Sequence, residues 1–489
     1  MKTLILFFAL LLISFYSNAQ ASVTRSVKDF GAKGNGYADD QDAFVKAAAF
    51  FRDRKGHGKL VIPKGTYIVG RQKFSGTDKK SAAYTGEYVL DLSGCTDVII
   101  EGKPGAVLKH RNGLRIGTFD PDDGKPFKHA IKDIQVKPEY HRYQSHPGCM
   151  IYISNSNNIR LSGFKLNGNS DNFIFGGNWG IGRNPFELVH YGIYVMDSHD
   201  INITNCSIEN FACDGIYVAN MGQQLKTFKI NIDKCKVNYS GRNGLSWVGG
   251  EGIAVTNSEF SNSGQAIVHE SPGAGIDVEV ENSSFCRKGY FNNCRMENNV
   301  GSAITSGSKK LATDVLFKNC IAASAAYYSL FADASSHTFE NCKFYGTVLV
   351  WYMGTAKKDG TKFNDCLFDE YYKGKKMYDG NYQLGMEATG VEVDHCIFNA
   401  YTTSSYYLAG HAGNCDTGNP LLLTVSNSTF NNYCAGGFKL GEKNAGIASY
   451  TVFYNNKFYS TKGTAFQNGF NSNCHADAGR NEFGIAVKK

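Results

Sequence analysis

The stretch INITNCSIENFACDGIYVAN, residues 201–220, contains one turn of a pattern that recurs along the chain. A polar residue, a cysteine, any residue and an apolar residue follow one another in it as NCSI (205–208). The pattern returns as KCKV, NCRM, NCIA, NCKF, DCLF and HCIF, and with Ser or Asn replacing Cys as NSEF, NSTF and NNKF. Successive Cys positions, from Cys206 to Asn456, are 22 to 36 residues apart. A period of this length with variable insertions is typical of a solenoid.

Each repeat also contains a second apolar strand, seen in YGIYVMD (191–197), DGIYVAN (214–220), NGLSWVG (243–249) and AGIDVEV (274–280). Two or three short strands per repeat, with Gly and Asn at the bends, predict an all-β, single-stranded parallel β-helix. Corresponding positions in neighbouring coils should then stack about 4.8 Å apart.

The repeated cysteines are expected to form an interior column of small hydrophobic side chains rather than disulfides. Their irregular spacing contains no C-x-x-C pair of the zinc-binding type. Cys415, Cys434 and Cys474 lie off this column, and a disulfide among them stays open.

The N-terminal segment MKTLILFFALLLISFYSNA has one Lys, an apolar run and small residues before a cleavage position after Ala19. This composition predicts a secretory signal peptide over residues 1–19 and a secreted or periplasmic protein. No later segment has enough consecutive apolar residues to span a bilayer, so no membrane partner is expected.

Residues 20–70 are expected to form a cap and the first strands, and residues 71–489 the β-helix with loop insertions. Asp39 and Asp40 precede an amphipathic run that continues to about residue 54, where carboxylates suit the start of a helix. The strands KLVI and YIV follow, joined by PKG. A helix before the first strands would close the end of the solenoid.

VKDFGAKGNGYADD (27–40) and IPKGTY (62–67) resemble the start of the pectate-lyase-like right-handed parallel β-helix superfamily, especially its rhamnogalacturonase/epimerase type. The resemblance implies a right-handed helix and a carbohydrate-active protein, which could be a hydrolase, lyase, epimerase or tailspike. Of the polygalacturonase motifs N-T-D, D-D, G-H-G and R-I-K on consecutive coils, CDGI (213–216) matches only the Asp-Gly part, and the only GHG (56–58) lies beside the cap and not on a mid-rod coil. The resemblance therefore identifies no catalytic residue.

The formal charge is +7, or +6 without Lys2, and no Lys/Arg stripe of the nucleic-acid-binding kind is present. This mild balance is compatible with an acidic polysaccharide but does not establish one. The expected partner is thus a polysaccharide, acidic or not, and no nucleic acid. The sequence leaves the oligomeric state open.

SPGAGIDVEVEN (271–282) alternates apolar and acidic residues, so Asp277 and Glu279 should point outward about 6.6 Å apart along the strand. Paired carboxylates at such distances perform glycoside hydrolysis, with inversion or retention left open. Asp214, Glu251 and His269 lie on neighbouring coils or at the entrance to this strand, and we include them as catalytic candidates. The alternative is a solvated acidic strand.

Sugar-binding residues are predicted around the acidic strand. Tyr194 and Tyr217 should share the outward column of Ser246 and Asp277, and aromatic rings offer platforms for sugar faces. The insertion NSDNFIFGGNWGIGRNPFELVHYG (169–192) supplies Trp179 for stacking and Arg183 for an acidic group, unless this loop packs its own Phe residues against the rod.

Three functions compete. The first is a glycoside hydrolase using Asp277 and Glu279, with no cofactor. The second is a polysaccharide lyase, in which His269, Arg242, Arg287 and Lys288 would serve β-elimination and acidic residues could hold Ca²⁺. The third is a non-catalytic glycan-binding β-helix. Arg242 is also a candidate substrate-binding residue, and no other metal site is predicted.

Overall fold

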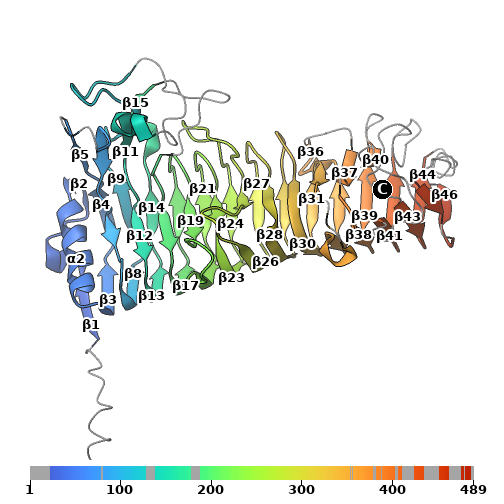
Figure 1. Cartoon of the computed structure of the whole chain (residues 1–489), viewed down its shortest axis with the longest axis horizontal. Helices are drawn as coiled ribbons and strands as arrows, with labels where there is room; N and C mark the ends of the chain where they lie inside the picture. Colours follow the sequence, from blue (N-terminus) through green and yellow to red (C-terminus); the bar gives the residue numbers. More distant parts are fainter. Residues whose placement is uncertain are drawn as a thin grey trace, which may run out of the picture.

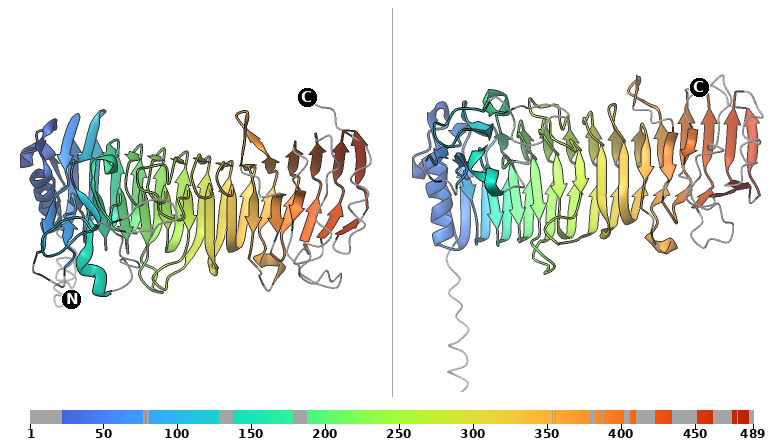
Figure 2. Two further views of the ribbon diagram at one scale, coloured as in Figure 1. Left: turned by 90° about the horizontal axis from the view of Figure 1, so that it is seen from above. Right: turned by 45° about the horizontal axis from the view of Figure 1, so that its top comes forward.

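Each coil of the chain consists of three short strands separated by bends, and each strand pairs in parallel with the corresponding strand one coil later. The resulting right-handed parallel β-helix is a rod with three sheets along its length, here called face 1, face 2 and face 3 (Figure 1). The strands stay aligned along the rod in two further views (Figure 2). The predicted fold class is confirmed.

The structure is a computed structural model. It describes residues 22–127 apart from 77, 79 and 80, then 138–177, and 188–401 apart from 353, 355, 378–381 and 387. Toward the C-terminus it describes 406–409, 423–433, 451–461, 475–477 and 479–485. The predicted signal peptide and Cys415, Cys434 and Cys474 lie outside the described residues.

Face 1 carries the candidate site. Its strands are β7 (Leu90–Asp91), β12 (Ile151–Ser154), β16 (Ile193–Met196), β19 (Ile216–Ala219), β22 (Leu245–Trp247), β25 (Ile276–Val278), the first parts of β28 (Ile304–Lys318) and β30 (Leu330–Glu340), β32 (Val348–Val350), β37 (Tyr382–Met386) and β40 (Tyr406–Ala409).

Face 2 follows face 1 in each coil. It contains β1 (Val23–Ser26), β3 (Gly56–Ile62), β8 (Thr96–Gly102), β13 (Asn157–Ser162), β17 (His199–Thr204), β20 (Phe228–Asp233), β23 (Gly250–Thr256), β26 (Cys286–Asn292), the second parts of β28 and β30, β33 (Lys362–Asn364), β38 (Glu392–Asp394), β41 (Leu423–Ser426), β43 (Thr451–Tyr454) and β45 (His475–Asp477).

Face 3 completes the coil. It contains β2 (Asn35–Asp39), β4 (Gly65–Val69), β9 (Ala106–His110), β14 (Lys165–Asn167), β18 (Ser207–Glu209), β21 (Lys236–Asn238), β24 (Glu259–Ser261), β27 (Arg295–Glu297), β29 (Ile321–Ala323), β31 (Lys343–Tyr345), β34 (Leu367–Asp369), β39 (Ile397–Ala400), β42 (Thr429–Asn432), β44 (Lys457–Ser460) and β46 (Glu482–Ile485).

The recurring sequence pattern is the bend between face 2 and face 3. Its polar residue has a left-handed backbone, which lets the chain turn sharply and which Asn tolerates better than most residues. In all ten repeats φ of this residue lies between 50° and 56°, at Asn205, Lys234, Asn257, Asn293, Asn319, Asn341, Asp365, His395, Asn427 and Asn455. The pattern therefore marks one corner of each coil.

The repeated cysteine points inward directly after this corner. The seven Cys residues of the pattern are buried and free, as predicted for an interior column. Small side chains with an acceptor atom suit this place, because the Cys235 N–H donates to Ser258 Oγ (3.0 Å) and the Cys396 N–H donates to Ser428 Oγ (2.9 Å) one coil later.

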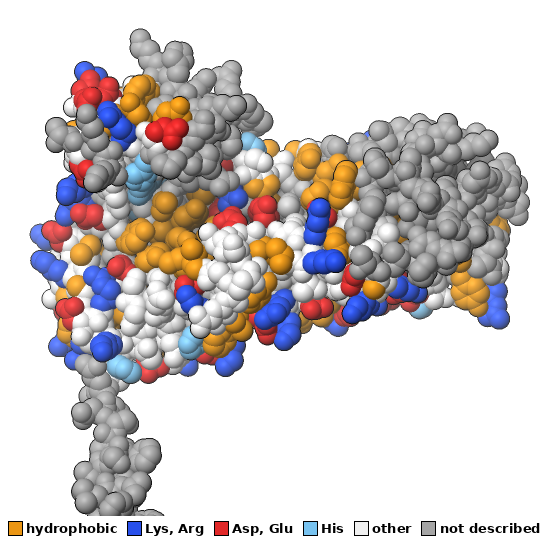
Figure 3. All heavy atoms as spheres, viewed as in Figure 1, with side chains coloured by type: hydrophobic (Ala, Val, Ile, Leu, Met, Phe, Trp, Pro, Cys, Tyr) orange, Lys and Arg blue, Asp and Glu red, His pale blue; other side chains and the backbone are white. Residues whose placement is uncertain are grey.

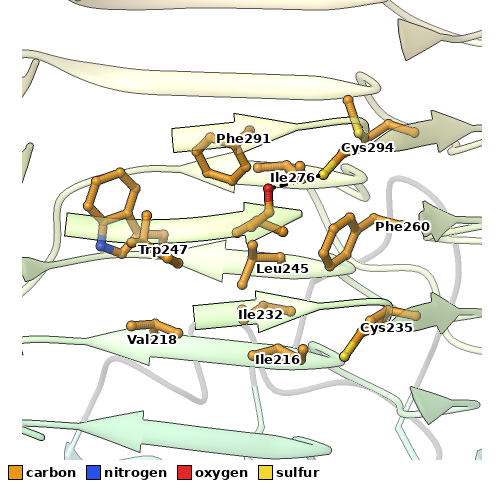
Figure 4. Packing of buried hydrophobic residues seen from close by; sticks show 14 of the residues in the cluster. Ile216, Val218, Ile232, Cys235, Leu245, Trp247, Phe260, Ile276, Phe291 and Cys294 are labelled. Carbon is orange, nitrogen blue, oxygen red and sulfur yellow. Dashed lines mark hydrogen bonds between the residues drawn. The ribbon is translucent and has the colours of Figure 1, made fainter. Parts of the chain in front are cut away.

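The interior is filled by columns of apolar side chains, one per strand position. Ile216, Leu245 and Ile276 are in register on three successive face 1 strands and point into the rod (Figure 4). The Phe rings at the end of the sequence pattern stack similarly, with Phe368 and Phe398 at 4.4 Å between centroids. These inward columns leave the alternate residues of face 1 pointing outward.

The N-terminal end is closed by α2 (Gln41–Asp53), as the sequence predicts (Figure 1). Its apolar side packs Phe44 and Phe51 into the core, and Phe44 meets Tyr67 edge-on at 5.4 Å. Short 3-10 helices lie at Val27–Phe30, Pro138–Tyr143, Ser170–Asn172 and Lys357–Asp359. No helix among the described residues has the length and apolar character needed to cross a membrane.

Two small sheets lie off the coils and were not predicted. A five-stranded lobe beside the N-terminal coils contains β5 (Gln72–Phe74), β6 (Tyr84–Gly86), β10 (Arg115–Thr118), β11 (Gln144–His146) and β15 (Ile174–Gly176) (Figure 1). A hairpin pairs β35 (Tyr371–Tyr372) with β36 (Lys375–Lys376). β15 belongs to the insertion that was expected to form a loop.

The corner residue Asn319 provides a test of the fold. Its φ is 54°, and its Nδ2 donates to Asn292 Oδ1 at 2.9 Å. We expect Asn319→Val to destabilise the protein by about 1–2 kcal/mol, because a β-branched residue resists the left-handed conformation. Chemical denaturation followed by circular dichroism measures the loss.

The matched control is Asn231→Val. Asn231 lies on β20, where the backbone is extended, and its Nδ2 likewise donates to an Asn of the preceding coil, Asn202, at 3.2 Å. Asn319 in addition accepts a hydrogen bond from Asn341 Nδ2 at 2.7 Å, so only a loss well above that of Asn231→Val is assigned to the corner conformation. Equal losses for the two variants would mean that the corner conformation contributes nothing special.

Candidate active site

An open groove crosses the outer side of face 1 at β25, β28 and β30. Two adjoining hollows of about 470 Å³ and 540 Å³ form it, and they share Ser271, Pro272, Thr305 and Phe331. The first hollow is also lined by Arg242, Asp277, Glu279, Gly307, Ser308 and Asp333, and the second by His269, Val300, Gly301, Ser302, Ala326 and Tyr327. The first hollow therefore contains the carboxyls of Asp277 and Glu279, from the predicted acidic segment, together with that of Asp333.

One outward column of face 1 leads along the rod to this groove. Strand pairing aligns Tyr194 with Tyr217, Tyr217 with Ser246, and Ser246 with Asp277. This confirms the alignment predicted from the sequence. The column begins earlier at Tyr152 and continues beyond Asp277 to Thr305 and Phe331.

The acidic strand differs from its prediction in length and in exposure. β25 ends at Val278, so Glu279 and Glu281 lie beyond the strand, although the Glu279 N–H still donates to the Trp247 carbonyl. Ile276 and Val278 are buried as expected, but Asp277 is also 0% exposed. The alternative of a solvated acidic strand is therefore wrong for Asp277, because surrounding side chains cover the outer face there.

A buried polar network links Asp277 to Asp214. Asp214 accepts hydrogen bonds from the Asn243 N–H (2.8 Å), from Ser246 Oγ (3.0 Å) and from Arg242 Nη1 (3.3 Å). Asn243 Nδ2 donates in turn to Asp277 Oδ2 at 3.0 Å. Asp214 thus fixes the residues that hold Asp277 and is better described as a positioning residue.

The pKa values of the two buried carboxyls are both raised, to different extents. The pKa of Asp277 is raised to about 8, chiefly by burial; the charge of Arg242 opposes this rise and that of nearby Glu279 contributes to it. Burial also raises the pKa of Asp214, although Arg242 and the hydrogen bonds from Asn243 and Ser246 oppose the rise. Asp277 is therefore a neutral acid at neutral pH, and its Oδ1 has no hydrogen-bond partner among the described residues.

Two further carboxyls lie at the groove. Glu279 is exposed at its edge. Asp333 follows Ala332, which aligns with Ser306 and hence with Val278, so Asp333 occupies the position of Glu279 two coils later. Partial burial raises the pKa of Asp333. In such an arrangement the protonated acid can donate a proton to a bound molecule, and a neighbouring carboxylate can accept a proton from water.

Two predicted catalytic residues lie apart from the buried network. Glu251 is on face 2, where its carboxylate contacts Arg287 Nε (2.6 Å) and Lys288 Nζ (2.9 Å), and the hydrogen bond from Lys288 lowers its pKa. These contacts suit a surface ion pair that joins two coils. His269 lines the second hollow, with Nδ1 3.1 Å from the Gly264 carbonyl oxygen.

The predicted binding residues are placed unequally. Tyr194 is half-buried, with its ring 4.8 Å from Tyr217. Tyr217 is buried, and its hydroxyl donates to Glu281 Oε2 at 2.5 Å, so this member of the column is held in place by its neighbours. Arg242 is buried against Asp214. Trp179 and Arg183 lie outside the described residues.

Among the residues that the structure describes, no three or more His, Cys, Asp or Glu side chains are arranged so that they could hold a metal ion.

The sequence interpretation missed Asn243, Asp333 and Phe331. Asn243 directly precedes the strand that contains Ser246, so its place at the bend offered a signal. Asp333 offered none, because β28 contains register shifts between Ser306 and Thr313 that obscure the coil repeat. Phe331 likewise depends on that register.

Comparison with known proteins supports the fold. Residues 191–415 match the model of the right handed beta helix region. The solved structure of the pre-mature bacteriophage phi29 gene product 12 superposes with a TM-score of 0.55 at 15% identity, covering 93% of this chain and 55% of that one. These two matches confirm the right-handed parallel β-helix fold that the resemblance implied.

Two curated plant proteins are similar in sequence. A polygalacturonase of Malus domestica is 52% identical over 56 residues, which is 12% of each chain. A probable polygalacturonase of Arabidopsis thaliana is 24% identical over 283 residues, which is 52% of this chain and 60% of that one. The chain therefore spans less than two thirds of either relative.

The raised pKa of Asp277 predicts a pH-dependent stability. The folded protein holds a proton that the unfolded chain, with a carboxyl pKa of about 3.9, releases, so stability falls as pH rises from about 4 to about 8. The slope should be at most about 1.4 kcal/mol per pH unit. Asp277→Asn does not titrate, so its melting temperature relative to the wild type should rise between about pH 5 and about pH 8.

Asp233→Asn is the control. A hydrogen bond from Thr256 lowers the pKa of Asp233, so its contribution is complete above about pH 5 and the gap to the wild type should stay constant. A constant gap for Asp277→Asn as well would contradict the neutral state assigned to Asp277.

Proposed function

Because the chain folds as a right-handed parallel β-helix with carboxyls gathered in one groove, we propose that it is a glycoside hydrolase that cleaves a polysaccharide in the face 1 groove. One observation carries the proposal. A neutral, buried carboxyl with an unpartnered oxygen lies at the floor of a groove that holds two more carboxyls. The similarity to plant polygalacturonases supports the same reaction class.

The proposed reaction begins with proton donation. Asp277 gives its proton to the glycosidic oxygen as the bond from that oxygen to the anomeric carbon breaks. In an inverting reaction, Glu279 or Asp333 takes a proton from the water that attacks the anomeric carbon. In a retaining reaction, one of them attacks that carbon itself, and the ionised Asp277 then takes the proton of the water that displaces it. The leaving sugar ends with a hydroxyl, and the other product has a new reducing end.

The surroundings of Asp277 favour hydrolysis over β-elimination. Elimination needs a cation that neutralises the uronate carboxylate, and Arg242 is the described guanidinium that lines the groove. Arg242 is already bound to the buried Asp214 at 3.3 Å and to the Ser271 carbonyl at 3.4 Å. Its charge thus serves the buried network, while Asp277 holds a proton that it can donate.

The direct test is a polysaccharide panel followed for reducing ends and for the ultraviolet absorbance of unsaturated sugars. We expect reducing ends without absorbance. Asp277→Asn should lower kcat about 10²–10⁴-fold, because it removes the general acid. The wild-type rate should fall as pH rises above about 8, where Asp277 loses its proton.

Asp233→Asn, on face 2, serves as the control and should keep the wild-type rate. Comparing Glu279→Gln with Asp333→Asn identifies the second carboxyl, since the larger loss marks the group that handles water. Absorbance that rises with the reducing ends would replace the hydrolase by a lyase. Full activity of Asp277→Asn would remove Asp277 from the mechanism.

We further propose that the protein is exported, because residues 1–19 have the composition of a signal peptide. Mass spectrometry of the protein from the periplasm or the medium should find Gln20 as its first residue. A cell-retained protein that still carries residues 1–19 would contradict this proposal.

A further inference from the structure

We propose that the groove accepts an uncharged polysaccharide, whose sugar faces bind to a tyrosine column on face 1. This column consists of Tyr152, Tyr194 and Tyr217, with Tyr88 stacked on Tyr152. This inference rests on the proposed function and adds the substrate class. The positive net charge and the names of the plant relatives would instead suggest an acidic polysaccharide. We give more weight to the charges and side chains at the groove itself, since these are what a bound polymer contacts.

The charges at the groove oppose a polyuronate. Glu279 and Asp333 line it together with the buried network, and its guanidinium, Arg242, is engaged by Asp214. Lys309 is exposed near Asp333 and is the cation that opposes its pKa rise. A polyuronate carries a carboxylate on every sugar, so binding here would bring like charges together with too few cations to offset them.

The cations next to the tyrosine column are also paired with carboxylates. Arg52 Nη1 contacts Asp91 Oδ2 at 3.3 Å, and Asp91 aligns with Tyr152. Lys226 Nζ contacts Asp197 Oδ2 at 3.1 Å. These two cations are thus already neutralised by carboxylates and offer an anionic polymer little attraction.

The tyrosine column offers a surface suited to uncharged sugars. Tyr88 stacks on Tyr152 at 4.5 Å, Tyr152 meets Tyr194 edge-on at 5.4 Å, and Tyr194 meets Tyr217 edge-on at 4.8 Å. Tyr88, Tyr152 and Tyr194 are half-buried, so each keeps part of its ring at the surface. Such rings bind the apolar C–H faces of sugars and leave the hydroxyls to polar neighbours.

The spacing of this column suits a polymer lying along the rod. Corresponding positions are about 4.8 Å apart from coil to coil, close to the length of one sugar unit, so successive sugars would meet successive coils. Figure 3 shows hydrophobic side chains gathered on the N-terminal half of the rod, with Asp and Glu side chains beside them. A chain placed along Tyr152 and Tyr194 would therefore point along face 1 toward the groove at Asp277, beyond the coils of the covered Tyr217 and Ser246.

Binding is tested on the full protein carrying Asp277→Asn, which keeps the site neutral and prevents cleavage. Affinity electrophoresis compares uncharged galactan, arabinan, xyloglucan and galactomannan with polygalacturonate and alginate. We expect retardation by at least one uncharged polymer and by neither polyuronate. The retardation should be insensitive to NaCl between about 0.05 and about 0.5 M, since screening affects only charged contacts.

Tyr152→Ala on the same background should weaken the binding about tenfold, because it removes one stacking platform. Tyr290→Ala is the matched control, since this exposed tyrosine lies on face 2. Circular dichroism confirms that both variants fold. An unchanged affinity of Tyr152→Ala, preferential binding of a polyuronate, or binding of no uncharged polymer would each overturn the inference.

Wild-type activity separates this inference from the proposed function. Hydrolysis of polygalacturonate with no binding of uncharged polymers would keep the hydrolase and remove the substrate class. Tyr152-dependent binding of an uncharged polymer that the wild type never cleaves would keep the substrate class and remove the hydrolase.

Discussion

The structure depends on the register in which the backbone of each coil forms hydrogen bonds with the backbone of the next coil. A left-handed residue turns the chain after face 2, and the following small side chain accepts the N–H of the coil before it, as Ser258 does for Cys235. A shift of one residue would exchange the inward and outward sets of a strand. Because the corner fixes that register, Ser246 and Asp277 lie next to each other although they are 31 residues apart in sequence.

The same register produces the buried network on the outside of face 1. Strands β19, β22 and β25 place Asp214, Asn243 and Asp277 at consecutive coils, and one backbone N–H, one hydroxyl and one guanidinium converge on Asp214. Burying two carboxyls with a single Arg is unfavourable unless a proton replaces the missing cation. The raised pKa of Asp277 is the consequence, so its chemistry follows from how its neighbours distribute charge.

The sequence predicts what is periodic and local. The Cys-containing repeat and the aligned strands were sufficient to predict the fold and the outward column of Tyr194, Tyr217, Ser246 and Asp277. The amphipathic run after Asp40 was sufficient to predict the capping helix. Periodicity cannot tell an exposed outward residue from a covered one, so the burial of Asp277 and Tyr217 was not foreseen. Nor could it align Asp333, because β28 shifts its register.

The hydrogen bonds of Asp214 and Asp277 differ, and the difference favours a structural role for Asp214 and a functional role for Asp277. Asp214 satisfies its oxygens with three donors, and a buried ion pair of this kind is common as a purely structural device. Asp277 is different, since its Oδ1 has no partner among the described residues and its burial lacks that compensation. An apolar side chain at this place would fold at least as well. A local choice that opposes stability without a compensating contact is expected at sites of function.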